Sequence, residues 1–192
     1  MTAKLKDYSK KSVRFFLDEL AAPASSPGGG SAAALVAASA CALVEMVAGI
    51  NDRRLKTSSG DQLKHLKNIR TKLLRLMTDD VKAFRVLQKS LKKKSLSFRQ
   101  KDRIFLRAAT PPFEICKLSA EIAAACQKQK KRTSLWLMSD WREALILART
   151  AFYAAWLNVE ANLTLVKDQR LTQKFHGHMK KIQSDIDAYA QN

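Results

Sequence analysis

Three consecutive glycines, Gly28, Gly29 and Gly30, stand between Pro27 and Ser31, directly before a long alanine-rich segment. Glycine has no side chain, so this run leaves backbone N–H groups accessible where the following helix begins. A planar or anionic ligand can bind against such a helix start. The pattern therefore predicts a ligand site at the glycines, with Ser31 as the N-cap of the helix. A flexible linker or a plain helix entry is the alternative reading.

Two carboxyl groups are candidates for acid or base chemistry, because a positioned carboxyl can donate or accept a proton. Asp80 lies in the segment LMTDDVKAF, and Asp140 follows Ser139 at the start of a long apolar segment. Both have an ordinary structural alternative. Asp79 and Asp80 stand among basic residues at intrahelical spacing, and either Ser139 or Asp140 can cap the helix that begins there.

Asn158 and Asn162 stand four residues apart in an otherwise apolar helical pattern, so they share one face of that helix. Buried amides need hydrogen-bond partners. A bound ligand or a neighbouring helix can supply them, and the spacing alone does not decide between the two.

No metal site is predicted. His176 and His178 stand in the tail without a nearby carboxylate or cysteine, which makes a weak site for a metal. The three cysteines are scattered through apolar helical patterns, which favours reduced, buried thiols in a cytoplasmic protein.

The composition predicts one all-α domain over residues 1–192. Hydrophobic residues make up 46% of the chain and charged residues 27%, with only 6 glycines and 4 prolines. Helical periodicity accounts for nearly the whole chain. Turns are expected at 56–60, 92–94 and 127–132. The expected helices are Ser12–Ala21, a helix starting at Ser31, one from Leu63 through Leu87, Phe98–Cys126 with a bend at Pro111-Pro112, Ser139–Val166 and Asp168–Asn192.

The segment from Ala32 to Ile50 is nearly long enough to span a membrane, but it is mostly alanine and contains Glu45. Its small side chains let other helices approach closely. It is therefore expected to be the central helix of a bundle rather than a membrane span. The first twenty residues mix charges through their apolar part, which no signal peptide tolerates.

The motifs in this order resemble the formiminotetrahydrofolate cyclodeaminase and methenyltetrahydrofolate cyclohydrolase family. The matching segments, which extend from about Phe16 to Asp168, are PGGGSAAALVAASACALVEMVA, LMTDDVKAF, TPPFEICKLSAEI, MSD at Met138–Asp140 and LNVEANL at Leu157–Leu163. The glycine loop and the Asn-Val-x-x-Asn-Leu segment are the most specific of these.

The resemblance implies an all-helical homodimer with a tetrahydrofolate derivative as its substrate, and no metal or prosthetic group. It implies that Asp80 and Asp140 act as acid and base in a cyclohydrolase or cyclodeaminase, that is, a hydrolase or lyase of one-carbon metabolism. The substrate-binding residues it implies are Gly28, Gly29, Gly30, Ser31, Ser139, Asn158 and Asn162. Because the sequence carries no formiminotransferase region, the cyclohydrolase is the first expectation.

Several positions depart from the family pattern. Ser134–Trp136 replaces a usual Asn-x-Asn element, Trp141 and Arg142 replace small residues, Thr78 replaces a carboxylate, and Thr164 stands where a lysine often follows. The alternative function is therefore a catalytically degenerate helical protein that binds folate or a polyanion.

The positive net charge of the chain indicates an anionic partner. Lys and Arg number 35 against 17 Asp and Glu, which gives a net charge of +18. A folate polyglutamate tail attracted by a basic groove is the first expectation, and its candidate residues are Arg53, Arg54, Lys64 and Lys67. Nucleic acid bound at 92–94 and 128–132 is the second, although no recognition motif supports it. A membrane surface ranks last.

Overall fold

The computed structural model describes residues 5–92 and 95–190, and every regular element within these ranges is helical. The all-α prediction is therefore confirmed. In chain order the elements are η1 (Tyr8–Lys10), α1 (Val13–Ala21), α2 (Gly29–Leu55), α3 (Gly60–Leu91), α4 (Phe98–Gln129), η2 (Lys130–Arg132), η3 (Leu135–Leu137), α5 (Met138–Leu163) and α6 (Gln169–Ala190).

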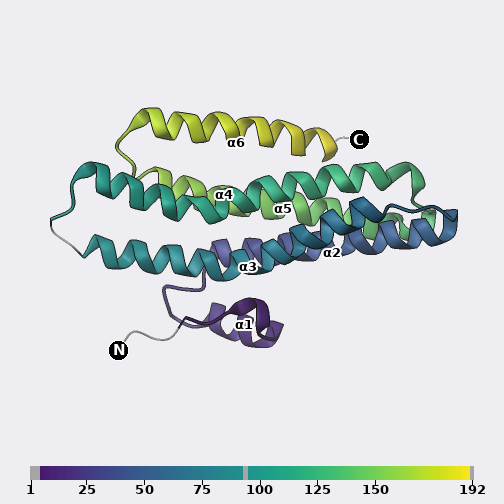
Figure 1. Ribbon diagram of the computed structural model, residues 1–192, viewed down its shortest axis with the longest axis horizontal. Helices are drawn as coiled ribbons and strands as arrows, with labels where there is room; N and C mark the ends of the chain where they lie inside the picture. Colours follow the sequence, from purple (N-terminus) through teal and green to yellow (C-terminus); the bar gives the residue numbers. More distant parts are fainter. Residues whose placement is uncertain (1–4, 93–94, 191–192) are drawn as a thin grey trace.

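Helices α2 to α5 form an antiparallel four-helix bundle in which each helix returns alongside the one before it, and α5 packs back against α2 (Figure 1). Helix α6 packs on α4 and α5 along one edge of the bundle. At the opposite edge η1 packs on α3, and Tyr8 of η1 meets Phe16 of α1 edge to face with ring centroids 5.5 Å apart. The glycine loop therefore enters the bundle between α1 and the main helices.

Helix α2 lies inside the bundle, where it packs against α3, α4 and α5. Its alanines make this possible, since a methyl side chain lets neighbouring backbones approach closely. The alanines that α2 buries almost completely are Ala33, Ala34, Ala37, Ala40 and Ala48. By length and composition α2 is also apolar enough to span a membrane, yet half of its apolar window is buried in the bundle.

The start of α2 differs from the prediction. The helix begins at Gly29 rather than Ser31, and its N-cap is Gly28, which has an extended backbone. Ser31 is therefore not the N-cap. Its side chain is fully buried, and its hydroxyl contacts α3 instead.

Other boundaries shift by a few residues. Helix α4 continues to Gln129 and passes through Pro111 and Pro112 in its interior. Helix α5 ends at Leu163, and α6 starts at Gln169. Neither Ser139 nor Asp140 caps α5, since the N-cap position is Leu137. The predicted loop at 92–94 and the end of the last helix lie partly outside the described residues.

A buried carboxylate ties one end of the bundle together. Asp52, near the end of α2, accepts hydrogen bonds from the backbone N–H of Ser59 at 2.7 Å and from the Ser59 hydroxyl at 2.9 Å. Arg132 of η2 donates to the same carboxylate at 2.8 Å. Because these groups satisfy one another, the α2–α3 turn and the basic η2 segment form one fixed unit.

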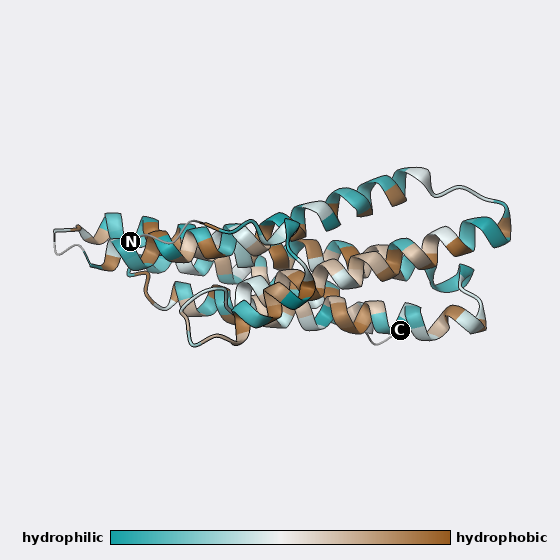
Figure 2. Ribbon diagram, turned by 90° about the horizontal axis from the view of Figure 1, so that it is seen from below, coloured by the Kyte–Doolittle hydropathy of each residue, from teal (hydrophilic) through white to brown (hydrophobic). Residues whose placement is uncertain are grey.

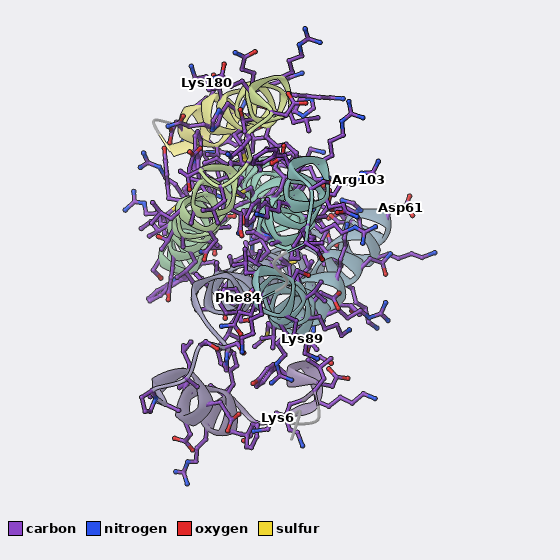
Figure 3. The ribbon with its side chains drawn as sticks, turned by 90° about the vertical axis from the view of Figure 1, so that its left-hand side faces the viewer. Lys6, Asp61, Phe84, Lys89, Arg103 and Lys180 are labelled. Atoms are coloured by element: carbon purple, nitrogen blue, oxygen red, sulfur yellow. The ribbon has the colours of Figure 1, made fainter. Side chains whose placement is uncertain are left out.

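The hydropathy of the residues agrees with the packing of the helices into a bundle. In Figure 2 the hydrophobic colour concentrates along the inner part of the bundle, and the hydrophilic colour at its two ends. Figure 3, which looks along the bundle, shows charged side chains around its outside, with Arg103 of α4 and Lys180 of α6 labelled. The positive charge is thus spread over several helices.

Gly30 is required by the close approach of α2 to α3. A Cβ atom added at Gly30 would lie 2.5 Å from Cγ of Asp80, which is too close for any real side chain. A Cβ added at Gly49 of the same helix meets nothing within 4 Å.

We therefore expect opposite effects from two glycine substitutions in α2. Gly30→Ala should lower the free energy of unfolding by about 1–3 kcal/mol, because it overpacks the contact with Asp80. Gly49→Ala should raise it by up to about 1 kcal/mol, because alanine is the better helix former. Urea unfolding followed by circular dichroism measures both. Equal stability of the two variants would contradict the packing described here.

Candidate functional site

A cavity of about 310 Å³ opens where the glycine loop meets the ends of α3 and α5. We call it the glycine-loop cavity. Its lining brings together residues that are far apart in the sequence. The candidates that line it are Gly28, Gly29, Gly30, Asp80, Asn158 and Asn162. Most of the predicted site is thus assembled in one place by α2, α3 and α5.

Asp80 lies against the start of α2. The Ser31 hydroxyl is 3.1 Å from Oδ2 of Asp80 and 2.8 Å from the carbonyl oxygen of Met77. One hydroxyl carries one proton and can also accept a hydrogen bond. If Ser31 donates to Met77, a protonated Asp80 can donate to Ser31, so this arrangement accommodates the carboxylic acid as well as the carboxylate.

Burial raises the pKa of Asp80 above its ordinary value of 3.8, and hydrogen bonds from the Ser31 side chain and backbone oppose this rise only in part. The neighbouring Asp79 behaves differently, since it pairs with Lys82 at 2.7 Å on the surface of α3. The alternative of an ordinary intrahelical ion pair therefore applies to Asp79. Asp80 is a partly buried carboxyl group at a cavity, which is where acid and base catalysts are found.

The two asparagines are held by their own helix. The amide of Asn158 donates to the carbonyl oxygen of Ala154 at 2.8 Å, and that of Asn162 donates to the carbonyl oxygen of Asn158 at 2.8 Å. A Cβ added at Gly29 would lie 3.1 Å from Nδ2 of Asn158, so Gly29 lets this amide approach the loop. Each amide keeps hydrogen-bonding capacity that a ligand in the cavity can use.

The rest of the lining is largely apolar and was not identified from the sequence. Phe84 and Leu87 of α3 and Leu165 after α5 supply apolar surface, and Ser25 and Ser26 lie on the loop before the glycines. Phe84 is labelled in Figure 3, where α2 and α3 lie side by side. Helical spacing from Asp80 to Phe84 and Leu87 could have predicted that they share one face. A cavity with an apolar wall and a few polar groups suits a flat, partly polar ligand.

Four predicted site residues lie at the other end of the bundle. Ser139 and Asp140 are in the first turn of α5, about 27 Å along the helix from Asn158. Arg53 and Arg54 are in the last turn of α2, about 36 Å from Gly29. Within one chain they do not reach the glycine-loop cavity.

Two of the departures from the family pattern lie outside the cavity lining. Thr78 is buried on another side of α3, where its hydroxyl accepts the backbone N–H of Tyr8 at 2.9 Å. Thr164 follows α5 and donates to the carbonyl oxygen of Ala161 at 3.0 Å. Neither substitution removes a polar group from the cavity wall.

Metal ligands are not gathered here. Within residues 5–92 and 95–190 no cluster of three or more His, Cys, Asp or Glu side chains is placed to hold a metal ion. His176 instead lies 3.2 Å from Glu160. All three cysteines are free and buried, and burial raises the pKa of Cys41 and of Cys126 to about 12, so these thiols stay protonated.

Two proteins of known function are similar to this chain over most of its length. The methenyltetrahydrofolate cyclohydrolase of Methylorubrum extorquens is 27% identical to the chain over 176 residues, which cover 85% of each protein. The crystal structure of formiminotetrahydrofolate cyclodeaminase from Thermotoga maritima matches with a TM-score of 0.85 and 25% identity, over 95% of this chain and 93% of that one.

The family comparison covers the bundle and the whole glycine-loop cavity. Residues 12–181 match the formiminotransferase-cyclodeaminase family, a span that contains α1 to α5 and most of α6. The matched span contains the loop at Gly28–Gly30 and the helix with Asn158 and Asn162. The chain therefore belongs to the formiminotransferase-cyclodeaminase family.

Proposed function

We propose that the protein is an enzyme of tetrahydrofolate one-carbon metabolism, and that it hydrolyses methenyltetrahydrofolate. The observation that carries the proposal is Asp80, a partly buried carboxyl group with a raised pKa that faces a cavity beside the glycine loop. A relative aligned over most of both chains is a methenyltetrahydrofolate cyclohydrolase, which supports this activity. The similar formiminotetrahydrofolate cyclodeaminase makes formiminotetrahydrofolate the second substrate to assay. In this proposal the reaction uses the tetrahydrofolate substrate alone, without a metal or prosthetic group in the enzyme.

The reaction needs a water molecule delivered to a cationic carbon and a proton moved between the folate nitrogens. Asp80 in its carboxylate form takes a proton from the water as the oxygen attacks the methenyl carbon. The resulting carboxylic acid then gives this proton to the nitrogen that leaves the carbon. The hydroxyl proton of the adduct passes to solvent as the formyl C=O bond forms, so that one proton is released overall. A raised pKa suits this exchange, because it brings the two protonation states closer in energy near neutral pH.

The amides and the glycines orient the substrate. Asn158 and Asn162 offer hydrogen bonds to the pterin or to the one-carbon unit, and the open backbone at Gly28 and Gly29 accommodates the flat ring against the start of α2. Phe84 and Leu87 exclude water from one side of the cavity.

A catalytically degenerate protein that binds folate or a polyanion is the second candidate. It is favoured by Trp136, which is 93% exposed where the family pattern has a small polar element. Assays of purified protein with methenyltetrahydrofolate and with formiminotetrahydrofolate, beside calorimetric titration with tetrahydrofolate, separate the two. Binding without turnover of either substrate would favour the second candidate.

Replacement of Asp80 should separate catalysis from folding. Asp80→Asn keeps the shape of the side chain but cannot exchange a proton, so turnover of methenyltetrahydrofolate should fall by at least about 100-fold. Absorbance decay, corrected for spontaneous hydrolysis, measures this loss. Asp79→Asn is the matched control on the same helix and should keep turnover within about twofold of the original protein.

The same variant should be more stable than the original protein, in a pH-dependent way. Because Asp80 has a higher pKa in the folded than in the unfolded chain, its ionisation lowers stability as pH rises from 3.8 through the folded pKa. Above this window Asp80→Asn should therefore have the higher melting temperature. Well below pH 3.8 this advantage should vanish. An Asp80→Asn protein that is less stable at neutral pH would contradict the raised pKa.

Loss of one cavity amide should weaken substrate binding more than folding. Asn158→Leu removes the hydrogen-bonding group that faces the glycine loop, and we expect a rise in KM or Kd of about tenfold. Asn68→Leu, on α3 away from the cavity lining, is the control. Unchanged affinity of Asn158→Leu, measured by calorimetry, would remove this amide from the binding site.

A further inference from the structure

The hydroxyl of Ser31 does not open into the glycine-loop cavity. Gly28, Gly29 and Gly30 line that cavity, but Ser31, the next residue, is fully buried and is not part of the lining. Its side chain lies against α3, where both of its hydrogen-bonding partners are found. Ser31 can therefore influence a ligand in the cavity through Asp80 rather than by binding the ligand directly.

The single hydroxyl proton of Ser31 has two acceptors on α3. Oγ of Ser31 lies 2.8 Å from the carbonyl oxygen of Met77 and 3.1 Å from Oδ2 of Asp80. A hydroxyl has one proton to donate. Because Met77 stands inside α3, its carbonyl oxygen also accepts the backbone N–H four residues later. This oxygen is therefore not left unpaired when the hydroxyl turns away from it.

The direction of the hydroxyl follows the protonation state of Asp80. A carboxylate attracts a hydroxyl proton more strongly than a peptide carbonyl does, so Ser31 donates to Oδ2 when Asp80 is ionised. When Asp80 carries a proton on Oδ2, it donates to Oγ of Ser31, which then donates to Met77. The change needs only a rotation of the Ser31 hydroxyl, and Ser31 keeps its own proton throughout.

Asp80 is the only ionisable residue among the described residues that line the cavity. Burial raises its pKa, and the hydrogen bonds from Ser31 lower it. The charged residues that stand nearest to the lining in sequence are not part of it; they are Glu45 of α2, Asp79, Lys82 and Arg85 of α3, Arg107 of α4, Glu160 of α5 and Lys167 after α5.

We infer that Ser31 is a positioning residue for Asp80: its hydroxyl turns between Oδ2 of Asp80 and the carbonyl oxygen of Met77, and so gives the carboxyl group a partner in both of its protonation states. The heavy atoms stay in place, because Ser31 is fully buried and the carboxyl group packs against Gly30. A partner that is already in position reduces the rearrangement that a proton transfer needs.

For catalysis the inference rests on the proposed function, in which Asp80 takes a proton from water. Only the carboxylate can accept that proton. Burial alone would keep Asp80 in its acid form to higher pH, and the Ser31 hydroxyl opposes this because it stabilises the carboxylate. Ser31 thus increases the fraction of the protein that carries the base near neutral pH.

Titration of Asp80 tests the role of Ser31 without any folate. The NMR signal of the Asp80 carboxyl carbon, identified by its absence in Asp80→Asn, follows the ionisation of this residue. Ser31→Ala removes the hydroxyl donor and should move the titration of Asp80 to higher pH. Ser31→Cys keeps the shape of the side chain but is a weaker donor, so it should move the titration in the same direction. An unmoved titration in a folded variant of either kind would overturn the inference.

Ser39→Ala is the matched control for Ser31→Ala. Ser39 also stands on α2, but it is exposed, and its hydroxyl donates to the carbonyl oxygen of Leu35 in the same helix at 3.1 Å. The titration of Asp80 should be unchanged in this variant. A change as large as in Ser31→Ala would overturn the specific role of Ser31.

The pH profile of turnover separates positioning from a merely structural role. Turnover should rise with pH as Asp80 ionises, and Ser31→Ala should move this rise to higher pH. On the rising part of the profile we expect turnover of methenyltetrahydrofolate to fall by about tenfold, because the carboxylate loses a charge-assisted hydrogen bond. A structural role alone would lower the melting temperature and leave the position of the rise unchanged, which would overturn the inference.

Failure of the proposed function is distinguishable from failure of this inference. A moved titration of Asp80 in Ser31→Ala, without turnover by the original protein, would reject the one-carbon activity and leave the pairing of Ser31 with Asp80 standing. Turnover by the original protein, with an unmoved titration and an unmoved pH profile in Ser31→Ala, would reject the role of Ser31 and leave the activity standing.

Discussion

The arrangement of the site depends on one close contact, between the start of α2 and the carboxyl group of Asp80 on α3. Glycine at position 30 leaves room for that carboxyl, and the buried Ser31 hydroxyl lies within hydrogen-bonding distance of both the carboxyl and the Met77 carbonyl oxygen. The contact fixes α2 against α3 and at the same time buries Asp80 in part. The same carboxyl group therefore packs α3 against α2 and is the candidate acid or base. Glycine precedes the most helical segment of the chain because a side chain at Gly30 would collide with this group.

Most of the fold could be predicted from the sequence, because apolar side chains recur at helical spacing and alanine-rich segments suit a bundle centre. The start of α2 could not. A serine after glycines is a normal N-cap, but Ser31 is drawn into the core by α3, a long-range contact that no local pattern contains.

One chain brings most of the predicted site together. Gly28–Gly30, Asp80, Asn158 and Asn162 come together as expected, whereas Asp140 and Arg53 lie at the far end of the bundle. Spacing in sequence says which residues share a helix face, but not which ends of which helices meet.

A crystal structure of the protein with a stable tetrahydrofolate analogue tests the central claim most directly. The account predicts the pterin ring against Gly29 and Asn158, with the one-carbon position within hydrogen-bonding distance of Asp80. A pterin bound elsewhere, with Asp80 still enclosed by Ser31 and Gly30 and touching no ligand, would contradict it.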